Sequence, residues 1–166
     1  MKNSKGGCLC ADVRYEIVAD PIALFCCHCT ECQTTCGSSF VLALRVPYRG
    51  VAVTKGEARL YVRPEADGQE RNVARCPRCL TALWSEALGS PQYHTVYAGT
   101  LDDSSALRPV AHIWTQDAQP WISLPASVLQ YPQNPPDMHA IAKAWTPDAR
   151  TLTSGVRPNH DDNASS

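Results

Sequence analysis

Long apolar runs are absent from this sequence of 166 residues. The longest, residues 22–27 and 40–44, are far shorter than the roughly 20 apolar residues that a membrane-spanning helix needs. An excess of positive charge is absent too, because 15 Lys and Arg residues face 16 Asp and Glu residues, for a formal net charge of -1. A phosphate backbone would meet no general positive field. We expect a soluble protein without a membrane or nucleic-acid partner.

A signal-peptide pattern is also missing. Residues 1–16 contain basic side chains but no apolar stretch of the kind that directs export. We therefore expect a cytoplasmic location, in which thiols stay reduced.

Long helices are excluded by closely spaced glycine and proline residues, of which the chain has 9 and 13. Between them lie short runs rich in β-branched and aromatic residues, which predict strands. The predicted strands are residues 13–18, 39–46, 58–62, 81–85, 94–98 and 110–114. Because 44% of the residues are hydrophobic, the chain can bury one core. The sequence predicts a single, mainly β domain.

Two short segments suggest helix. Residues 30–37 favour one or two helical turns, with Thr30 as the N-cap and Gly37 as the terminator. After about residue 129 the chain becomes rich in proline and then polar, so we expect residues 132–166 to form a partly mobile tail. Within it, residues 138–145 carry apolar side chains at helical spacing and suggest a short docked helix.

Nine cysteines are the most informative feature of the composition. Their odd number fits a disulfide framework poorly, whereas their short spacings suit metal ligation. Cys76 and Cys79 form a C-P-x-C turn that aims two sulfurs at one point, and Cys8 and Cys10 form a C-x-C pair. Together these four cysteines would make a closed tetrahedral site, which predicts a structural metal that ties the N-terminal strand to a distant turn.

A second group differs in kind. Cys27, Cys29 and Cys32 place three thiols within six residues and predict a metal site with one open position, as a catalytic zinc site has. Cys26, Cys36 or His28 remain alternatives for a fourth ligand that closes this site, and redox-active or simply buried thiols are further alternatives.

Other polar and aromatic residues have structural explanations that compete with functional ones. Asp102 and Asp103 favour a turn that caps backbone N–H groups, and His112 favours a core position over a proton shuttle. The aromatic residues are expected to fill the core, with one or two at a pocket: Trp84, Tyr97, Trp114 and Trp121. Four arginines are expected mainly at the surface, although each could bind a substrate carboxylate: Arg14, Arg71, Arg75 and Arg78.

Several motifs follow one another in a recognisable order. G-x-C-x-C with V-R-Y-E occupies residues 6–16, H-C-x-x-C residues 28–32 and C-x-x-C residues 76–79. G-x-L-D-D then occupies residues 99–103 and P-x-x-H-I residues 109–113. Over roughly residues 5–131 the chain resembles the glutathione-dependent formaldehyde-activating enzyme family. Two positions depart from the family pattern, since Ala11 and Leu80 stand where glycine usually follows the cysteine pairs.

The resemblance implies a β-tent fold of twisted antiparallel sheets and two zinc ions per chain. It assigns a structural zinc to Cys8, Cys10, Cys76 and Cys79, and a catalytic zinc to Cys27, Cys29 and Cys32. The implied activity is that of a carbon-sulfur lyase that forms S-hydroxymethylglutathione from glutathione and formaldehyde.

The mechanism that we expect uses the open zinc position. A thiol bound there would lose its proton near neutral pH and attack the aldehyde carbon. Two other functions compete with this one. A zinc-stapled β-tent module that binds a protein partner would close the second site with a fourth protein ligand, and a thiol-redox protein would form reversible disulfides.

Overall fold

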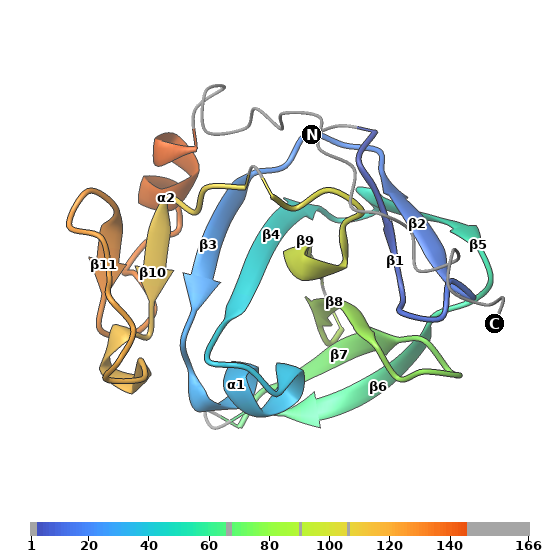
Figure 1. Cartoon of the computed structure of the whole chain (residues 1–166), viewed down its shortest axis with the longest axis horizontal. Coiled ribbons are helices and arrows are strands. Elements are labelled where there is room, and N and C mark those ends of the chain that lie inside the picture. Colours follow the sequence, from blue (N-terminus) through green and yellow to red (C-terminus); the bar gives the residue numbers. More distant parts are fainter. Residues whose placement is uncertain (1–2, 66–67, 90, 106, 146–166) are drawn as a thin grey trace, which may run out of the picture.

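In the computed structural model, which describes residues 3–65, 68–89, 91–105 and 107–145, the chain forms two β-sheets (Figure 1). The smaller sheet has the order β1-β2-β5, and the larger has the order β11-β10-β3-β4-β9-β8-β7-β6. The strands are β1 (Lys5–Gly7), β2 (Arg14–Ile17), β3 (Ala23–Cys27), β4 (Val41–Pro47), β5 (Val51–Lys55), β6 (Arg59–Pro64), β7 (Glu70–Arg75), β8 (Ala82–Ala87), β9 (Tyr93–Tyr97), β10 (Ala111–Ile113) and β11 (Leu129–Tyr131).

The prediction of a mainly β domain is confirmed, and every predicted strand corresponds to an observed one: β2, β4, β6, β8, β9 and β10. The expectation of purely antiparallel sheets is wrong in one place. β10 pairs in parallel with both β3 and β11, so the large sheet is mixed. Parallel neighbours need long connections, and here β10 reaches β3 only after most of the domain has been built.

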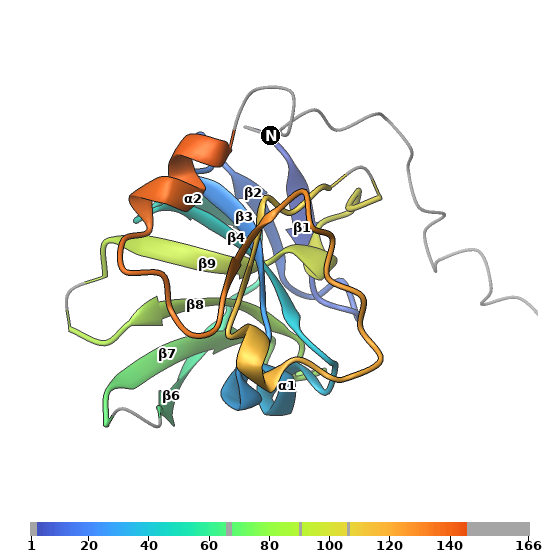
Figure 2. The ribbon, with the colours of Figure 1, turned by 90° about the vertical axis from the view of Figure 1, so that its left-hand side faces the viewer.

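The two faces of the large sheet have different roles. Leu24, Leu44 and Val96 point towards the smaller sheet, where they pack with Tyr15 and Trp84 in the main core. The rings of Tyr15 and Trp84 meet edge to face, with centroids 6.0 Å apart. The opposite face carries a second cluster of buried residues that includes the Cys27 and Cys29 side chains. Figure 2 shows β9, β8, β7 and β6 stacked in this order beneath α2 (His139–Ala144).

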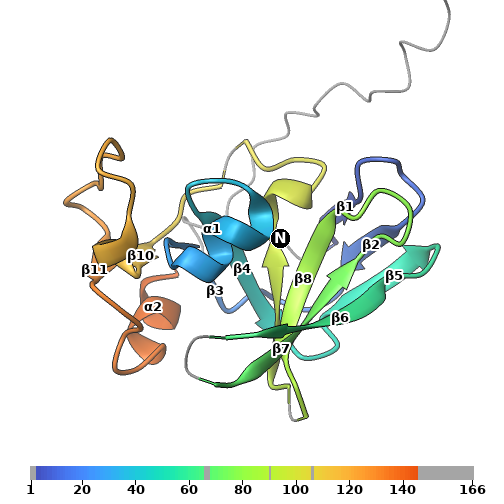
Figure 3. The same cartoon turned by 90° about the horizontal axis from the view of Figure 1, so that it is seen from below.

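Helix α1 (Thr30–Cys36) confirms the predicted helical turns and lies beside the ends of β3 and β4 (Figure 3). Its N-cap is Cys29, not Thr30: the Cys29 sulfur accepts a hydrogen bond from the Cys32 N–H at 3.4 Å. Gly37 ends the helix in the left-handed conformation, with φ of 63°. Within the described residues, two single turns of 3-10 helix complete the regular structure, η1 (Ala98–Thr100) and η2 (Thr115–Asp117).

The predicted docking of residues 138–145 is also confirmed. Helix α2 packs on β3, and Ile141 and Trp145 are almost completely buried. The expected tail therefore includes a segment that belongs to the core, whereas residues 146–166 lie outside the described part of the chain. No helix in the described ranges is long and apolar enough to cross a bilayer.

Candidate metal centres and substrate pocket

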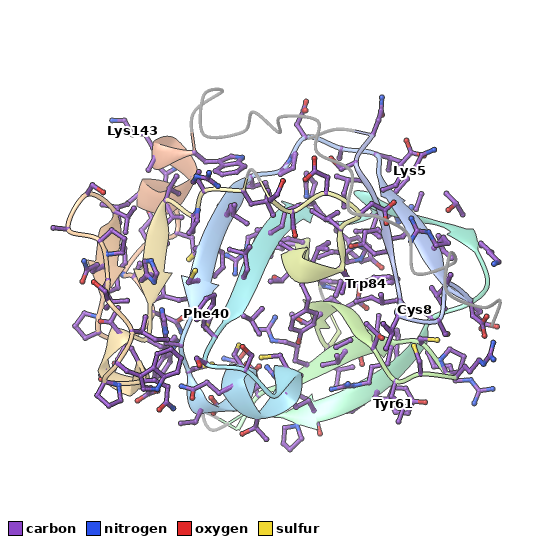
Figure 4. All side chains as sticks on the ribbon, viewed as in Figure 1. Lys5, Cys8, Phe40, Tyr61, Trp84 and Lys143 are labelled. Carbon is purple, nitrogen blue, oxygen red and sulfur yellow. The ribbon has the colours of Figure 1, made fainter. Side chains whose placement is uncertain are left out.

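Four cysteines from two distant parts of the sequence meet at one point. The sulfur atoms of Cys8, Cys10, Cys76 and Cys79 all lie within 4.8 Å of one another. Cys8 and Cys10 are 3.5 Å apart and Cys10 and Cys76 3.7 Å apart, close to the roughly 3.8 Å edge of a tetrahedron with metal-sulfur bonds of about 2.3 Å. All nine cysteines are free thiols. Figure 4 shows Cys8 beyond the end of β1, near other sulfur atoms. This cluster fits a metal ion.

Two similar turns carry these cysteines. The Ala11 N–H donates to the Cys8 carbonyl at 3.1 Å, and the Leu80 N–H donates to the Cys76 carbonyl at 3.0 Å. Both closing residues have positive φ, 58° for Ala11 and 60° for Leu80. Glycine adopts this conformation without strain, which explains why these were the two positions at which glycine was expected. The chain keeps the turn geometry without glycine.

Hydrogen bonds around the four-cysteine cluster stabilise ionised sulfur. The Val13 N–H donates to the Cys8 sulfur at 3.2 Å, and the Thr81 hydroxyl lies 3.2 Å from the Cys79 sulfur. Burial raises the pKa of Cys79, but hydrogen bonds with Thr81 and with Cys10 together outweigh this effect and hold the pKa at about 6. A thiolate that forms near neutral pH is the state in which cysteine binds a metal.

The second cluster lies where β3 meets α1. The sulfur atoms of Cys27, Cys29 and Cys32 all lie within 4.8 Å of one another, and those of Cys27 and Cys29 are 3.5 Å apart. The Cys27 and Cys32 side chains and the Cys32 N–H hydrogen-bond the Cys29 sulfur and hold the pKa of Cys29 far below its usual value, whereas the same contacts raise the pKa of Cys27. These contacts stabilise negative charge on the Cys29 sulfur, and the thiolate is the form of cysteine that binds a metal.

The three alternatives for a fourth ligand do not join this cluster. Strand alternation sends Cys26 to the opposite face of β3, where burial raises its pKa to about 12. His28 also turns away, and its Nε2 lies 2.8 Å from Nδ1 of His112. Cys36 is exposed at the end of α1. Among the described Cys, His, Asp and Glu residues, the cluster therefore has three members, as an open site requires.

A pocket opens directly over the three-cysteine cluster. Its floor is formed by apolar side chains on one face of the large sheet: Phe25 and Cys27 of β3, Val41 and Ala43 of β4, and Ile113 of β10. Tyr97 of β9 lies opposite Ala43 in the same row, and burial raises the pKa of its phenol to about 12. At the rim, the Trp114 indole N–H donates to Asn134 Oδ1 at 3.0 Å.

Charged residues also line the pocket, and most of them were not among the candidates from the sequence. They are Glu31, Arg45, Arg63, Glu65 and Arg71. Glu65 accepts hydrogen bonds from Arg63 and from Arg71, the latter at 2.9 Å. Burial alone would raise the pKa of Glu65, but these two guanidinium groups outweigh it and lower the pKa. The only hint in the sequence was Arg71, one of four arginines considered for carboxylate binding.

The remaining candidates lie outside the pocket. Asp102 pairs with Arg14, and Asp103 Oδ1 accepts hydrogen bonds from the Ser105 N–H and hydroxyl, which is the expected turn. His112 is buried, in agreement with a core position. The expectation that Trp121 fills the core is wrong, because 73% of its surface is exposed. It follows η2, in the loop that leads to β11.

A solved structure of a protein from Rhodobacter sphaeroides, a structural genomics target, is 19% identical in sequence. The match covers 59% of this chain and 87% of that chain, with a TM-score of 0.46. No curated protein matches. Residues 3–117, which include both cysteine clusters, match the family described as glutathione-dependent formaldehyde-activating enzyme. The chain therefore belongs to the glutathione-dependent formaldehyde-activating enzyme family.

Proposed function

We propose that the protein is a zinc-dependent enzyme of the carbon-sulfur lyase type. It would join a thiol such as glutathione to formaldehyde or another small aldehyde, in the manner of an S-(hydroxymethyl)glutathione synthase. The observation that carries the proposal is the pocket over Cys27, Cys29 and Cys32, where three thiols face open space and no fourth described side chain joins them. A cytoplasmic location agrees with nine free cysteines.

The two clusters would have separate tasks. Cys8, Cys10, Cys76 and Cys79 would hold a structural zinc, because four sulfurs complete a tetrahedral shell. Cys27, Cys29 and Cys32 would hold the second zinc and leave one position for substrate. All-sulfur donor sets favour zinc over magnesium or calcium. Bound zinc lowers the pKa of a thiol, so that the thiolate forms near neutral pH.

The chain's own residues would prepare the reaction in two ways. Phe25, Val41 and Ile113 exclude water from the floor of the pocket and so strengthen electrostatic interactions there. The Tyr97 phenol stays protonated because burial raises its pKa to about 12, so it can donate a hydrogen bond to the aldehyde oxygen. In the net reaction a C–S bond forms, the C=O π bond breaks, and the thiol proton ends on the new hydroxyl group.

The test compares Cys29→Ser with Cys36→Ser. Cys29 is buried in the three-cysteine cluster, whereas Cys36 is an exposed cysteine outside both clusters, which makes it a matched control. We expect Cys29→Ser to form the adduct no faster than the uncatalysed rate, and Cys36→Ser to match wild type, when the product is followed by NMR. If Cys29→Ser is folded, keeps its structural metal and still accelerates the reaction like wild type, the proposal is wrong.

A further inference from the structure

One cation in the pocket has no acidic partner. Arg63 and Arg71 share Glu65, so their charges are neutralised in part. Arg45 forms no ion pair or side-chain hydrogen bond with the described residues, and its Nε is buried without a partner. Buried charges are normally paired, because removing an ion from water costs free energy that only an opposite charge or hydrogen bonds restore. The pocket therefore presents a guanidinium that no acidic side chain of the described residues pairs with.

The structure holds the Arg45 side chain in place. Its guanidinium carbon lies 4.4 Å from the centroid of the Tyr93 ring and 5.4 Å from that of Phe25. These contacts are cation-π interactions, which fix the direction of the group. Burial lowers the pKa of Arg45, and the nearby Arg71 lowers it further, but guanidinium stays charged at any physiological pH. A fixed, charged fork of N–H donors matches a carboxylate with two parallel hydrogen bonds.

Arg45 also lies at a suitable distance from the cysteine cluster. Cys27 pairs with Val41 in the sheet, and Arg45 follows Val41 on the same face of β4 after four residues. At a rise of about 3.3 Å per residue, the Arg45 Cα lies roughly 13 Å along β4 from the Cα of Val41, the residue that pairs with Cys27. In an extended tripeptide the C-terminal carboxylate lies about 4–7 Å from the central Cα. The thiol side chain of the substrate, at the cysteine cluster, and the long side chain of Arg45 span the rest of this distance.

We propose that Arg45 binds a carboxylate of the thiol substrate and thereby selects carboxylate-bearing thiols of peptide length. This inference rests on the proposed function, because it takes the three-cysteine cluster as the point where the thiol sulfur binds. Arg45 is then a residue that determines specificity through substrate binding, and the chemical step itself occurs at the opposite end of the pocket.

The test measures binding of glutathione and of glutathione diethyl ester by titration calorimetry with the zinc-loaded protein under anaerobic conditions. Esterification removes both carboxylate charges and leaves the thiol unchanged. The variants are Arg45→Gln and Arg45→Lys, with Arg49→Gln as the matched control. Arg49 is an exposed arginine four residues further along, and it also lies against a tyrosine ring, 5.8 Å from the centroid of Tyr48.

We expect wild type and Arg49→Gln to bind glutathione about 10- to 100-fold more tightly than the diester, as a charge-assisted hydrogen-bonded pair implies. Arg45→Gln should bind both ligands with the weak affinity of the diester, and Arg45→Lys should recover part of the preference. In the assay of adduct formation, Arg45→Gln should raise KM for glutathione and leave kcat nearly unchanged.

The inference is overturned if wild type binds glutathione and the diester equally, or if Arg45→Gln keeps the wild-type preference. Where Arg45→Gln does not fold, Arg45→Lys takes its place: lysine keeps the charge but not the two parallel hydrogen bonds, so a full wild-type preference in that variant also overturns the inference. Failure of the proposed function looks different: wild type would prefer glutathione over the diester but would not accelerate adduct formation. Equal acceleration with both thiols would sustain the function and refute the role of Arg45.

Discussion

Replacement of Cys10 by serine should remove the metal staple that joins the N-terminal segment to the turn at Cys76 and Cys79. Cys10 and Cys76 are 66 positions apart, and their sulfurs lie 3.7 Å from each other. Closing a loop of this length restricts the unfolded chain by about 4 kcal/mol at 25 °C in the chain-entropy treatment of cross-links, which applies to metal clips as well as to disulfides. Cys10 is only half-buried, so its replacement adds little cavity cost. We expect Cys10→Ser to lower the free energy of unfolding by about 4 kcal/mol.

The assay is urea denaturation followed by circular dichroism, with Cys36→Ser as the matched control. Because Cys36 is exposed and lies outside both clusters, its replacement should change the free energy of unfolding by less than about 0.5 kcal/mol. The same experiment on wild type with a chelator should lower the free energy of unfolding at least as much as Cys10→Ser does, because a chelator removes this ion and also any ion held by the three-cysteine cluster. A loss below about 1 kcal/mol for Cys10→Ser would refute the staple.

Three further changes test the packing, the buried ionisable groups and the strained turns. Ile141→Ala should lower the free energy of unfolding by about 2–5 kcal/mol because Ile141 is fully buried, whereas Lys143→Ala on the same helix should have little effect in urea denaturation. Burial lowers the pKa of His94 below 6.5, while Glu86 only partly opposes this, so protons bind preferentially to the unfolded chain. The stability advantage of wild type over His94→Asn should therefore shrink from pH 7.5 to pH 5.5, and an advantage that grows would contradict this sign. Leu80→Gly should raise the free energy of unfolding by about 0.5–1 kcal/mol, and with it the melting temperature, because glycine adopts the positive φ of this exposed position without strain.

Local chemistry predicted six of the eleven strands of the described residues and both cysteine clusters. β-branched and aromatic runs between glycine and proline residues correspond to observed strands, because such side chains suit a half-buried pleated surface. The spacing of Cys27, Cys29 and Cys32 was enough to bring three sulfurs together, since all three lie on one short segment. β5 was missed because its residues are exposed or half-buried, and β7 because its two buried residues, Val73 and Ala74, are adjacent, so neither strand shows apolar alternation.

The position of Arg45 in the pocket could not be predicted, because it depends on pairing between strands that are distant in the sequence. Arg45 stands among apolar residues of β4, and its sequence context gives no reason to distinguish it from a surface arginine. Its meaning arises only when β3 and β9 place Phe25 and Tyr93 around it and β7 brings Arg71 near. The N-cap was missed for a similar reason, because a cysteine sulfur that accepts a backbone hydrogen bond becomes evident only in three dimensions.

Metal content per chain tests the central claim most directly, namely that two cysteine clusters hold separate ions. Protein purified under reducing conditions without added metal or chelator is analysed by mass spectrometry for zinc. The account predicts close to two zinc ions for wild type, and close to one for Cys29→Ser and for Cys10→Ser, since each variant loses one cluster. Equal zinc content in wild type and Cys29→Ser would contradict it, because the three-cysteine cluster would then hold no metal.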